Sequence, residues 1–325
     1  MRNPIEICTS TTPDYIPGTG IQLQLINIRH LKAHHHENAL EILYCLKGKA
    51  RAHVAHDYLE LSDGDLVTCD RDDIHNVIAD DDNLCLVVHI DLKHPNYTYE
   101  EMHNSFYSCT THPKYLRYPD RVNRICDLLL AAAYESSSND ELLAEKCEQI
   151  HLNIIDMMQK HFLWFSLEAD PAEGLDKYAD RFHQILGYIM DNYSSKITLA
   201  NLSDTLYLNP AYISNFISRT TFDSLTDSIG YFRCYYAEKL LLETDLSVGE
   251  ISPMVGFSSE KYFYKAFKKW WNITPLQHRK RYRRYAQIKE EYYEYSPSET
   301  RSIIKDYIAD RLVTNASKPA RHCPL

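Results

Sequence analysis

The stretch SVGEISPMVGFSSEKYFYKAFKKWWNITPLQHRKRYRR, residues 247–284, decides the fold of the second half of the chain. Between Ser258 and Trp270, apolar residues recur at helical spacing and predict one buried stripe, made of Phe263, Ala266, Phe267 and Trp270. Lysines follow another face of this helix, namely Lys261, Lys265 and Lys268, with Lys269 beside them. Such a helix suits a DNA groove, because lysines meet phosphates while the first turns reach base edges. A solvated basic helix is the alternative.

The residues before this helix predict a helix-turn-helix unit. Ser247 and Glu250 have capping-box spacing, so a short helix is expected to start at Val248. Gly256 would end that helix, and Ser258 would cap the long one. Pro253 conflicts with this pattern, because proline inside a helix removes a hydrogen bond and costs about 3 kcal/mol. We therefore expect the short helix to be kinked or shortened.

A second basic helix follows the first. Asn272 can take the left-handed conformation that ends a helix, and Thr274-Pro275 is an N-cap followed by a residue suited to the first helical position. Five cations follow Pro275, which are Arg279, Lys280, Arg281, Arg283 and Arg284. This segment is therefore expected to add phosphate contacts.

Residues 197–233 repeat the pattern. A short helix is expected around Leu202, and Asn209-Pro210 would cap and open the next helix. The outward positions of that helix are Ala211, Ser214, Asn215, Ser218 and Arg219. An apolar helix over residues 229–241 would join the two units and hold both recognition helices on one side of a duplex, about 34 Å apart.

These two runs resemble a known family. VGFSSEKYFYKAFKKWWNITPLQHRK, residues 255–280, resembles the second helix-turn-helix of AraC/XylS-type transcription regulators, and ITLANLSDTLYLNPAYISNFIS, residues 197–218, resembles the first. Phe222 and Asn272 stand where that family usually has glycine. We expect base contacts from Ala211, Ser214, Asn215, Glu260, Lys261 and Lys265. We expect phosphate contacts mainly from Arg219, Lys268, Lys269 and Arg279.

The charge of the chain is unevenly distributed. The net charge of −10 argues at first against a nucleic-acid partner. Residues 1–174, however, carry 14 Lys and Arg against 28 Asp and Glu, whereas residues 175–285 carry 15 against 11. A basic module is therefore joined to an acidic one that does something else.

Composition also limits the compartment and the chemistry. Nine cysteines, with no C-x-x-C pair, indicate reduced, mostly structural thiols. No apolar run approaches the roughly 20 residues of a membrane span, and the first 15 residues lack the core of a signal peptide, so a cytoplasmic protein is expected. The glycines form neither G-x-G-x-x-G, nor a P-loop, nor G-x-S-x-G, which removes the usual support for a nucleotide-dependent enzyme or a serine hydrolase.

The N-terminal half predicts a small antiparallel barrel or jelly roll. Between residues 21 and 91 the chain alternates short β-rich runs with turn signals: IQLQLINI, EILYCL, ARAHVAH, YLELSDGDLVTC and NLCLVVHID. His34, His36, Glu41 and Gly48 match the first motif of cupins, which this region resembles, while residues 64–75 match the second motif only loosely.

The histidines of this motif suggest a binding site. His34 and His36 face the same side of a strand, and with Glu41 and His75 they could bind Mn²⁺, Fe²⁺ or Zn²⁺. The family resemblance also implies sensor barrels that keep this pattern without a metal, and neither cofactor nor metal is assigned. The expected effector-binding set is His34, His36, Glu41, Tyr44, His53 and His75, and the resemblance implies a small-molecule effector such as a sugar.

Helices are also predicted after the barrel strands and after the helix-turn-helix segments. Residues 120–134 and 139–164 predict a helix pair whose apolar stripe either covers the barrel or forms a dimer face. Residues 166–174 have the composition of a linker. A last helix is expected after Ser296-Pro297, and it would either pack back on the helix-turn-helix module or mediate self-association.

Together these patterns predict an α+β chain of two domains. The expected division is a cupin-like sensing and dimerisation domain (1–165), a linker (166–174), a double helix-turn-helix domain (175–285) and a helical extension (286–325). The expected function is effector-controlled, sequence-specific DNA binding without catalysis. The expected partners are double-stranded DNA, the effector and a second copy, with RNA polymerase as a further candidate and no membrane. A metal-dependent cupin enzyme and a protein-interaction module are the alternatives.

Overall fold

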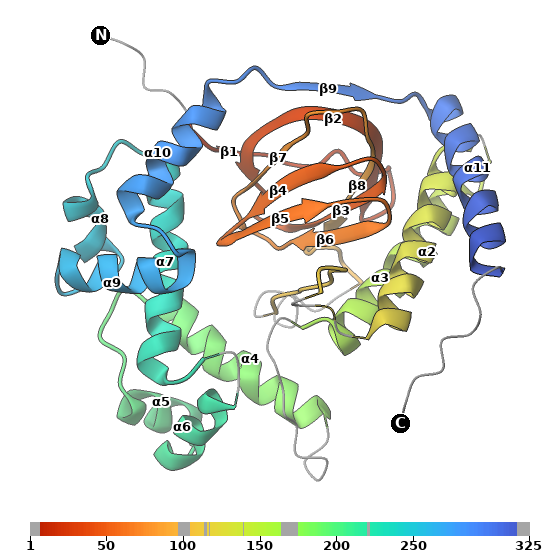
Figure 1. The fold of residues 1–325 in the computed structure, drawn as a ribbon. Helices are drawn as coiled ribbons and strands as arrows, with labels where there is room; N and C mark the ends of the chain where they lie inside the picture. The colour runs from red at the N-terminus through yellow and green to blue at the C-terminus, as the bar shows by residue number, and fades with distance from the viewer. Residues whose placement is uncertain are drawn as a thin grey trace.

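The structure is a computed structural model that describes residues 7–96, 105–113, 116, 118–138, 140–163, 175–219 and 222–316. A barrel lies at the centre of the view in Figure 1, with one group of helices on each side of it. The predicted linker, residues 166–174, lies outside the described residues.

The barrel is antiparallel and nearly closed, as predicted. Seven strands follow one path in the order β5-β4-β7-β2-β8-β3-β6. Their bounds are β2 (Ile21–His35), β3 (Ala39–Lys47), β4 (Ala50–Val54), β5 (Asp57–Leu61), β6 (Asp65–Cys69), β7 (His75–Ile78) and β8 (Leu84–Asp91). The short β1 (Thr9–Ser10) pairs in parallel with the end of β2. The loop between β3 and β4 turns at Gly48, where φ is +87° and a Cβ atom would lie 2.6 Å from the Asp82 carbonyl oxygen.

Alternate side chains of the strands line two different cores. On β3, Leu43 and Cys45 face the barrel interior, whereas Leu40, Ile42 and Tyr44 belong to the core beneath the helices. This strict alternation is why β3 is buried over nearly its whole length.

The predicted helix pair is α2 (Pro119–Ser136) and α3 (Leu143–His161). Its apolar stripe, which includes Val122, Ile125 and Leu129, is buried in the same core as the outer face of the barrel. The stripe therefore covers the barrel within one chain and is not free to form a dimer face.

The helical module follows the predicted order of elements. Its helices are α4 (Leu175–Asn192), α5 (Leu199–Leu206), α6 (Pro210–Ser218), α7 (Leu225–Glu243), α8 (Val248–Met254), α9 (Glu260–Trp271) and α10 (Pro275–Ala286). Helices α5 and α6 lie near the lower end of α7 in Figure 1, and α9 lies beside the middle of α7. The aromatic side chain of Phe222 is buried against Tyr231, Phe232 and Trp270, so the position that is usually glycine anchors the turn before α7.

Most of the predicted helix ends are confirmed. The Ser247–Glu250 capping box opens α8, and Thr274 opens α10 with a second capping box to Gln277. Gly256 has φ of +88°, and a Cβ atom there would lie 2.5 Å from the Ser194 carbonyl oxygen. Asn272 ends α9 in the left-handed conformation.

Two details of this unit differ from the sequence prediction. The turn after α8 takes one residue more than expected, so the N-cap of α9 is Ser259 and not Ser258. Trp271, which sequence spacing did not select, is buried at 4% exposure, whereas Trp270 is only half-buried. Pro253 lies in the last turn of α8, one residue before its end, and the helix is short, as expected.

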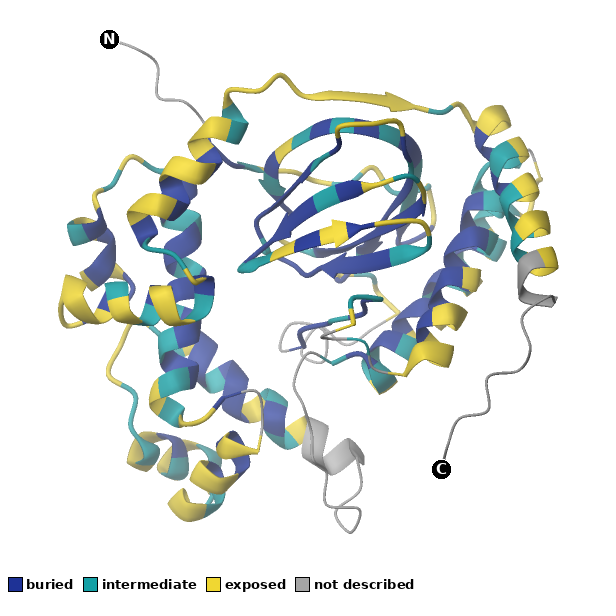
Figure 2. Cartoon of the chain, in the orientation of Figure 1, coloured by how far each residue is buried: buried dark blue, intermediate teal, exposed yellow. Residues whose placement is uncertain are grey.

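The C-terminal extension returns to the barrel. Strand β9 (Glu291–Glu294) is exposed along its length (Figure 2) and pairs antiparallel with Ile26–Ile28 of β2. Helix α11 (Pro297–Ala316) then packs on α2, where the Arg301 guanidinium lies 3.9 Å from the Tyr134 ring centroid and donates to the Tyr134 carbonyl oxygen. The tail therefore packs on the barrel and α2, and not on the helix-turn-helix module, which was one of the two predicted possibilities.

No helix in the described ranges is long and apolar enough to span a membrane. All eight cysteines within these ranges are buried and free, as the sequence predicted.

Ile304 tests the docking of α11, because its side chain is fully buried in the core shared with α2. We expect Ile304→Ala to lower the free energy of unfolding by about 2–5 kcal/mol through the cavity that it leaves. Leu312→Ala on the same helix, where the side chain is 66% exposed, should change it by less than about 0.5 kcal/mol. Urea denaturation measures both, and equal effects would contradict the docking.

Candidate DNA-binding surface and histidine cluster

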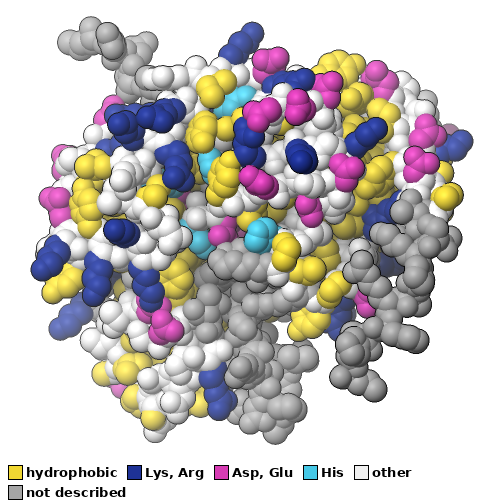
Figure 3. Space-filling model, viewed as in Figure 1, with side chains coloured by type: hydrophobic (Ala, Val, Ile, Leu, Met, Phe, Trp, Pro, Cys, Tyr) yellow, Lys and Arg dark blue, Asp and Glu magenta, His cyan; other side chains and the backbone are white. Residues whose placement is uncertain are grey.

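Helix α9 presents the predicted lysine ridge to solvent. Lys261, Lys265 and Lys268 are exposed, as is Glu260 at its first turn, while Phe263 and Phe267 are buried beneath them. In α10 the exposed cations are Lys280, Arg281, Arg283 and Arg284. Figure 3 shows Lys and Arg side chains gathered on the side of the molecule that α9 and α10 occupy. The surface can therefore bind phosphates.

Helix α6 is the second candidate recognition helix. Asn209 caps it by accepting from the Ala211 amide at 2.8 Å, which fixes the start of the helix. Its exposed positions agree with the sequence prediction: Ala211, Ser214, Asn215, Ser218 and Arg219. Ile213, Phe216 and Ile217 are buried in the core of the module and hold that face outward.

Sequence spacing missed two exposed aromatic residues on this surface. Tyr207 lies in the turn before α6, with φ of +55°, and is 94% exposed. Tyr262 lies in the first turn of α9 and is 59% exposed. Tyr262 lies beside Lys261 and Lys265 on the exposed side of α9, and an exposed tyrosine among cations is suited to contact a nucleic-acid backbone. The left-handed turn that exposes Tyr207 had no signal in the sequence, because it is not a glycine or an asparagine.

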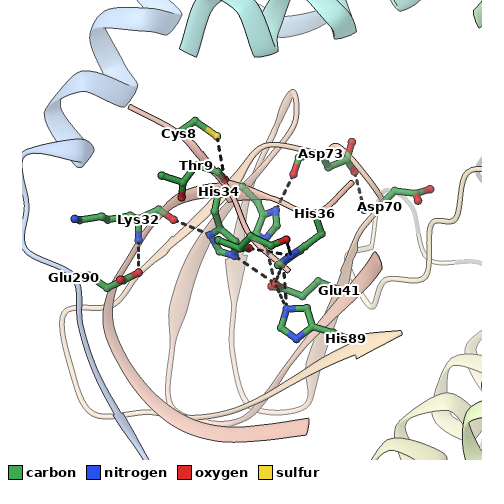
Figure 4. Close-up of polar contacts among 12 residues, drawn as sticks. Cys8, Thr9, Lys32, His34, His36, Glu41, Asp70, Asp73, His89 and Glu290 are labelled. Atoms are coloured by element: carbon green, nitrogen blue, oxygen red, sulfur yellow. Dashed lines mark hydrogen bonds and ion pairs between the residues drawn. The ribbon is translucent and has the colours of Figure 1, made fainter. Parts of the chain in front are cut away.

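Four histidines in the barrel converge on one carboxylate (Figure 4). The Nε2 atoms of His36, His75 and His89 lie 3.1, 3.1 and 3.0 Å from Oε2 of Glu41, and Nε2 of His34 lies 3.6 Å from it. The four residues that the sequence predicted to meet are thus brought together, namely His34, His36, Glu41 and His75. His89 was missed, although it pairs directly with Glu41 across β3 and β8 and shares the inward parity of Val87.

Backbone carbonyls fix the orientation of three of these rings. Nδ1 of His34 donates to the Lys32 carbonyl oxygen at 2.9 Å, and Nδ1 of His75 donates to the Asp73 carbonyl oxygen at 2.8 Å. Nδ1 of His36 lies 3.1 Å from the Thr11 carbonyl oxygen. A carbonyl oxygen can only accept, so Nδ1 carries the proton and Nε2 is left to face Glu41.

Burial and the contacts between the side chains together set the charges of the cluster. Burial alone would raise the pKa of Glu41, but the surrounding histidines outweigh it and hold that pKa well below its usual range. Burial lowers the pKa of His75 to about 4. A carboxylate faced by imidazole Nε2 atoms is the donor set that Zn²⁺, Fe²⁺ or Mn²⁺ prefers, so these residues fit a divalent cation.

Comparisons with known proteins agree with both halves of the molecule. A helix-turn-helix domain model matches residues 202–281, and a cupin domain model matches residues 29–91. The transcriptional regulator YdeC of Bacillus subtilis is 23% identical over 260 residues, which cover 76% of this chain and 85% of that protein. These matches agree with the resemblance of the chain to AraC/XylS-type transcription regulators.

Two further matches cover different shares of the chain. The melibiose operon regulatory protein of Escherichia coli K12 is 27% identical over 145 residues, which are 42% of this chain and about half, 48%, of that protein. A solved structure of ToxT from Vibrio cholerae is 12% identical, with a TM-score of 0.40, and covers 80% of this chain. The first two relatives are named as regulators, which agrees with the prediction of a transcription regulator.

Two of the predicted phosphate contacts need correction. Arg279 is buried, and its guanidinium donates to the carbonyl oxygens of Leu241 and Leu246 at 2.7 and 2.6 Å. It therefore satisfies the C-terminal end of α7 and does not reach DNA. The ammonium group of Lys269 pairs with Asp227 and Asp223, which compensate its charge.

Two of the predicted effector contacts also need correction, because strand parity turns them away from the barrel interior. Tyr44 lies on the opposite face of β3 from Glu41, and its hydroxyl accepts from the Arg311 guanidinium at 2.8 Å. His53 lies on the opposite face of β4 from Ala52. Its ring packs 5.2 Å from that of Tyr285 on α10.

The barrel rests on helix α7 through polar contacts that sequence could not predict. The Tyr235 hydroxyl donates to the Arg71 carbonyl oxygen at 2.6 Å, and the Lys239 ammonium pairs with Asp72 at 2.8 Å. His56 packs beside Trp271, with 5.8 Å between the ring centroids. The same helix that carries both recognition units therefore also contacts the barrel.

His53 makes the interface between barrel and α10 sensitive to acid. Burial lowers its pKa from 6.5 to about 4. Between these values the unfolded chain binds more protons than the folded chain, so stability falls as the pH falls from about 6.5 toward 4. We expect His53→Gln to lose less thermal stability than the wild type between pH 7 and pH 5, as measured by melting curves. A fall equal to that of the wild type would contradict this account.

Proposed function

We propose that this regulator binds a specific DNA sequence through α6 and α9 and that a small-molecule effector in the barrel controls this binding. One observation carries the proposal: α8, α9 and the barrel contact helix α7, and Phe222 in the turn after α6 packs on the same helix. Any movement of the barrel against α7 would change how the two units are presented to a duplex.

A short loop connects the histidine cluster to this helix. At one end of the loop, His75 contacts Glu41 inside the barrel. Three and four residues earlier, Asp72 and Arg71 contact α7. A ligand that moves His75 would therefore alter the contacts with α7. Control requires only that the effector binds one arrangement more tightly than the other.

The chemistry of the cluster limits the effector. Its imidazole nitrogens and carboxylate can bond to hydroxyl groups or coordinate a divalent cation. The similarity to a melibiose operon regulatory protein supports a sugar as the first class to test. A resident metal ion is the alternative, and His34, His36, Glu41 and His75 would hold it.

Other expectations remain part of the proposal. We keep the division at residues 1–165, 166–174, 175–285 and 286–325, with the extension packed on the first domain. We propose that the protein acts as a homodimer and contacts RNA polymerase. Because the stripe of α2 is buried within one chain, the dimer contact would use another surface.

The lysine ridge can be tested by its salt dependence. We expect Lys265→Ala and Lys268→Ala each to weaken binding to duplex DNA and to lower the salt slope of log K by about 1, because each removes one phosphate contact. Lys160→Ala on α3, which is also exposed, is the matched control and should leave the slope unchanged. Fluorescence anisotropy at several salt concentrations measures the slopes, and unchanged slopes in both ridge variants would favour a protein-interaction module.

The barrel site can be tested by ligand-dependent melting of the full chain against a panel of sugars and small metabolites. A ligand at 100 times its Kd should add about 2.7 kcal/mol. We expect Glu41→Gln to lose this gain and Glu60→Gln, an exposed carboxyl on β5, to keep it. Elemental analysis of the purified protein tests the alternative, since a stoichiometric metal lost in His36→Ala would make the cluster a metal site.

A further inference from the structure

A second cluster of metal-binding side chains lies between the barrel and the helical module. It joins Cys8, next to β1, with His35 at the end of β2 and Glu243 at the end of α7. One candidate ligand atom from each residue lies within 4.8 Å of the other two. Nε2 of His35 lies 2.6 Å from Oε1 of Glu243. Figure 4 shows Cys8 standing apart from Glu41, so this cluster is separate from the four histidines.

The surroundings of His35 match those of a metal ligand. Its other ring nitrogen, Nδ1, faces Oδ1 of Asp72 at 3.4 Å. A carboxylate behind the outer nitrogen orients a ligating histidine and makes it more basic. Lys239 holds this carboxylate from α7 at 2.8 Å. The ring is 1% exposed, so its orientation is set by these neighbours.

The thiol of Cys8 is aimed into the same place and has few competing bonds. The side chain is 3% exposed, and the one hydrogen bond recorded for it among the described residues is a weak one to the Thr9 carbonyl oxygen at 3.9 Å. Burial, with Glu243 and Glu238 adding to it, raises the pKa of this thiol. The thiol is therefore protonated without a metal and would release its proton to solvent on binding.

We propose that Cys8, His35 and Glu243 form a zinc site that fastens the barrel to helix α7. Thiolate, imidazole and carboxylate are all ligands of Zn²⁺, and water would complete a tetrahedron. Ligand atoms of a tetrahedral zinc lie about 3.3 Å apart, so Glu243 must withdraw slightly from His35. Its side chain is 33% exposed at the end of α7 and can do so, and the same opening admits the ion from solvent.

Cobalt is the probe that separates this site from the others. The histidine cluster and a third group, His94, Glu148 and His151, contain no cysteine. Only a thiolate ligand gives a charge-transfer band in the near ultraviolet when Co²⁺ binds. In full-length protein freed of metal and carrying Cys323→Ser, we expect this band to saturate at one equivalent of Co²⁺ and to disappear when Zn²⁺ is added. No band would overturn the proposal.

Matched variants decide which thiol is the ligand. Cys8→Ser should abolish the band. Cys69→Ser should keep it, since this buried thiol lies on β6 opposite Glu41 inside the barrel. If Cys69→Ser abolished the band and Cys8→Ser kept it, the ion would lie in the barrel, which would contradict the proposal.

Two carboxylate variants keep the test open if Cys8→Ser does not fold. Glu243→Gln leaves the core packing unchanged and should weaken Co²⁺ binding at least tenfold. Asp72→Asn should weaken it about 10- to 100-fold through the orientation of His35. Unchanged affinity in both variants would show that these residues are only an ion-paired contact between barrel and helix.

Discussion

The structure depends on the burial of helix α7 from several sides at once. Most helices of the molecule have one apolar face, but α7 buries residues around its circumference, including Ile229, Tyr231, Phe232 and Leu241. Such a helix is stable only when other elements cover all of it. The two recognition units cover part of α7 and the barrel covers another part, so their positions are set together.

Buried polar groups decide how these elements are oriented on α7. Inside the module, the His278 ring contacts the Glu238 carboxylate at 2.6 Å, with both side chains nearly inaccessible to water. Arg279 closes the end of α7 by binding two carbonyl groups. Between the barrel and α7, Asp72 pairs with Lys239, and the Tyr235 hydroxyl donates to the Arg71 carbonyl oxygen. Each contact would leave a costly unpaired group if the elements were packed differently, so each favours one arrangement.

The histidine cluster imposes the same kind of constraint inside the barrel. Glu41 is a charged group removed from water, and it is tolerated because imidazoles from β2, β7 and β8 surround it. The cluster therefore joins four strands, and a change in its occupancy would act on all of them. The loop from Asp72 to His75 joins this cluster to α7, because Asp72 pairs with Lys239 and His75 contacts Glu41.

The sequence by itself determined the features that depend on neighbours along the chain. The caps at Ser247, Asn209 and Thr274, the left-handed Asn272 and the motif that unites His34 with Glu41 are local, because spacing alone places those groups together. Tertiary packing decided the rest. It buried Arg279, turned His53 toward α10, added His89 to the cluster and carried the tail back to α2, since each of these outcomes depends on contacts between residues far apart in the chain.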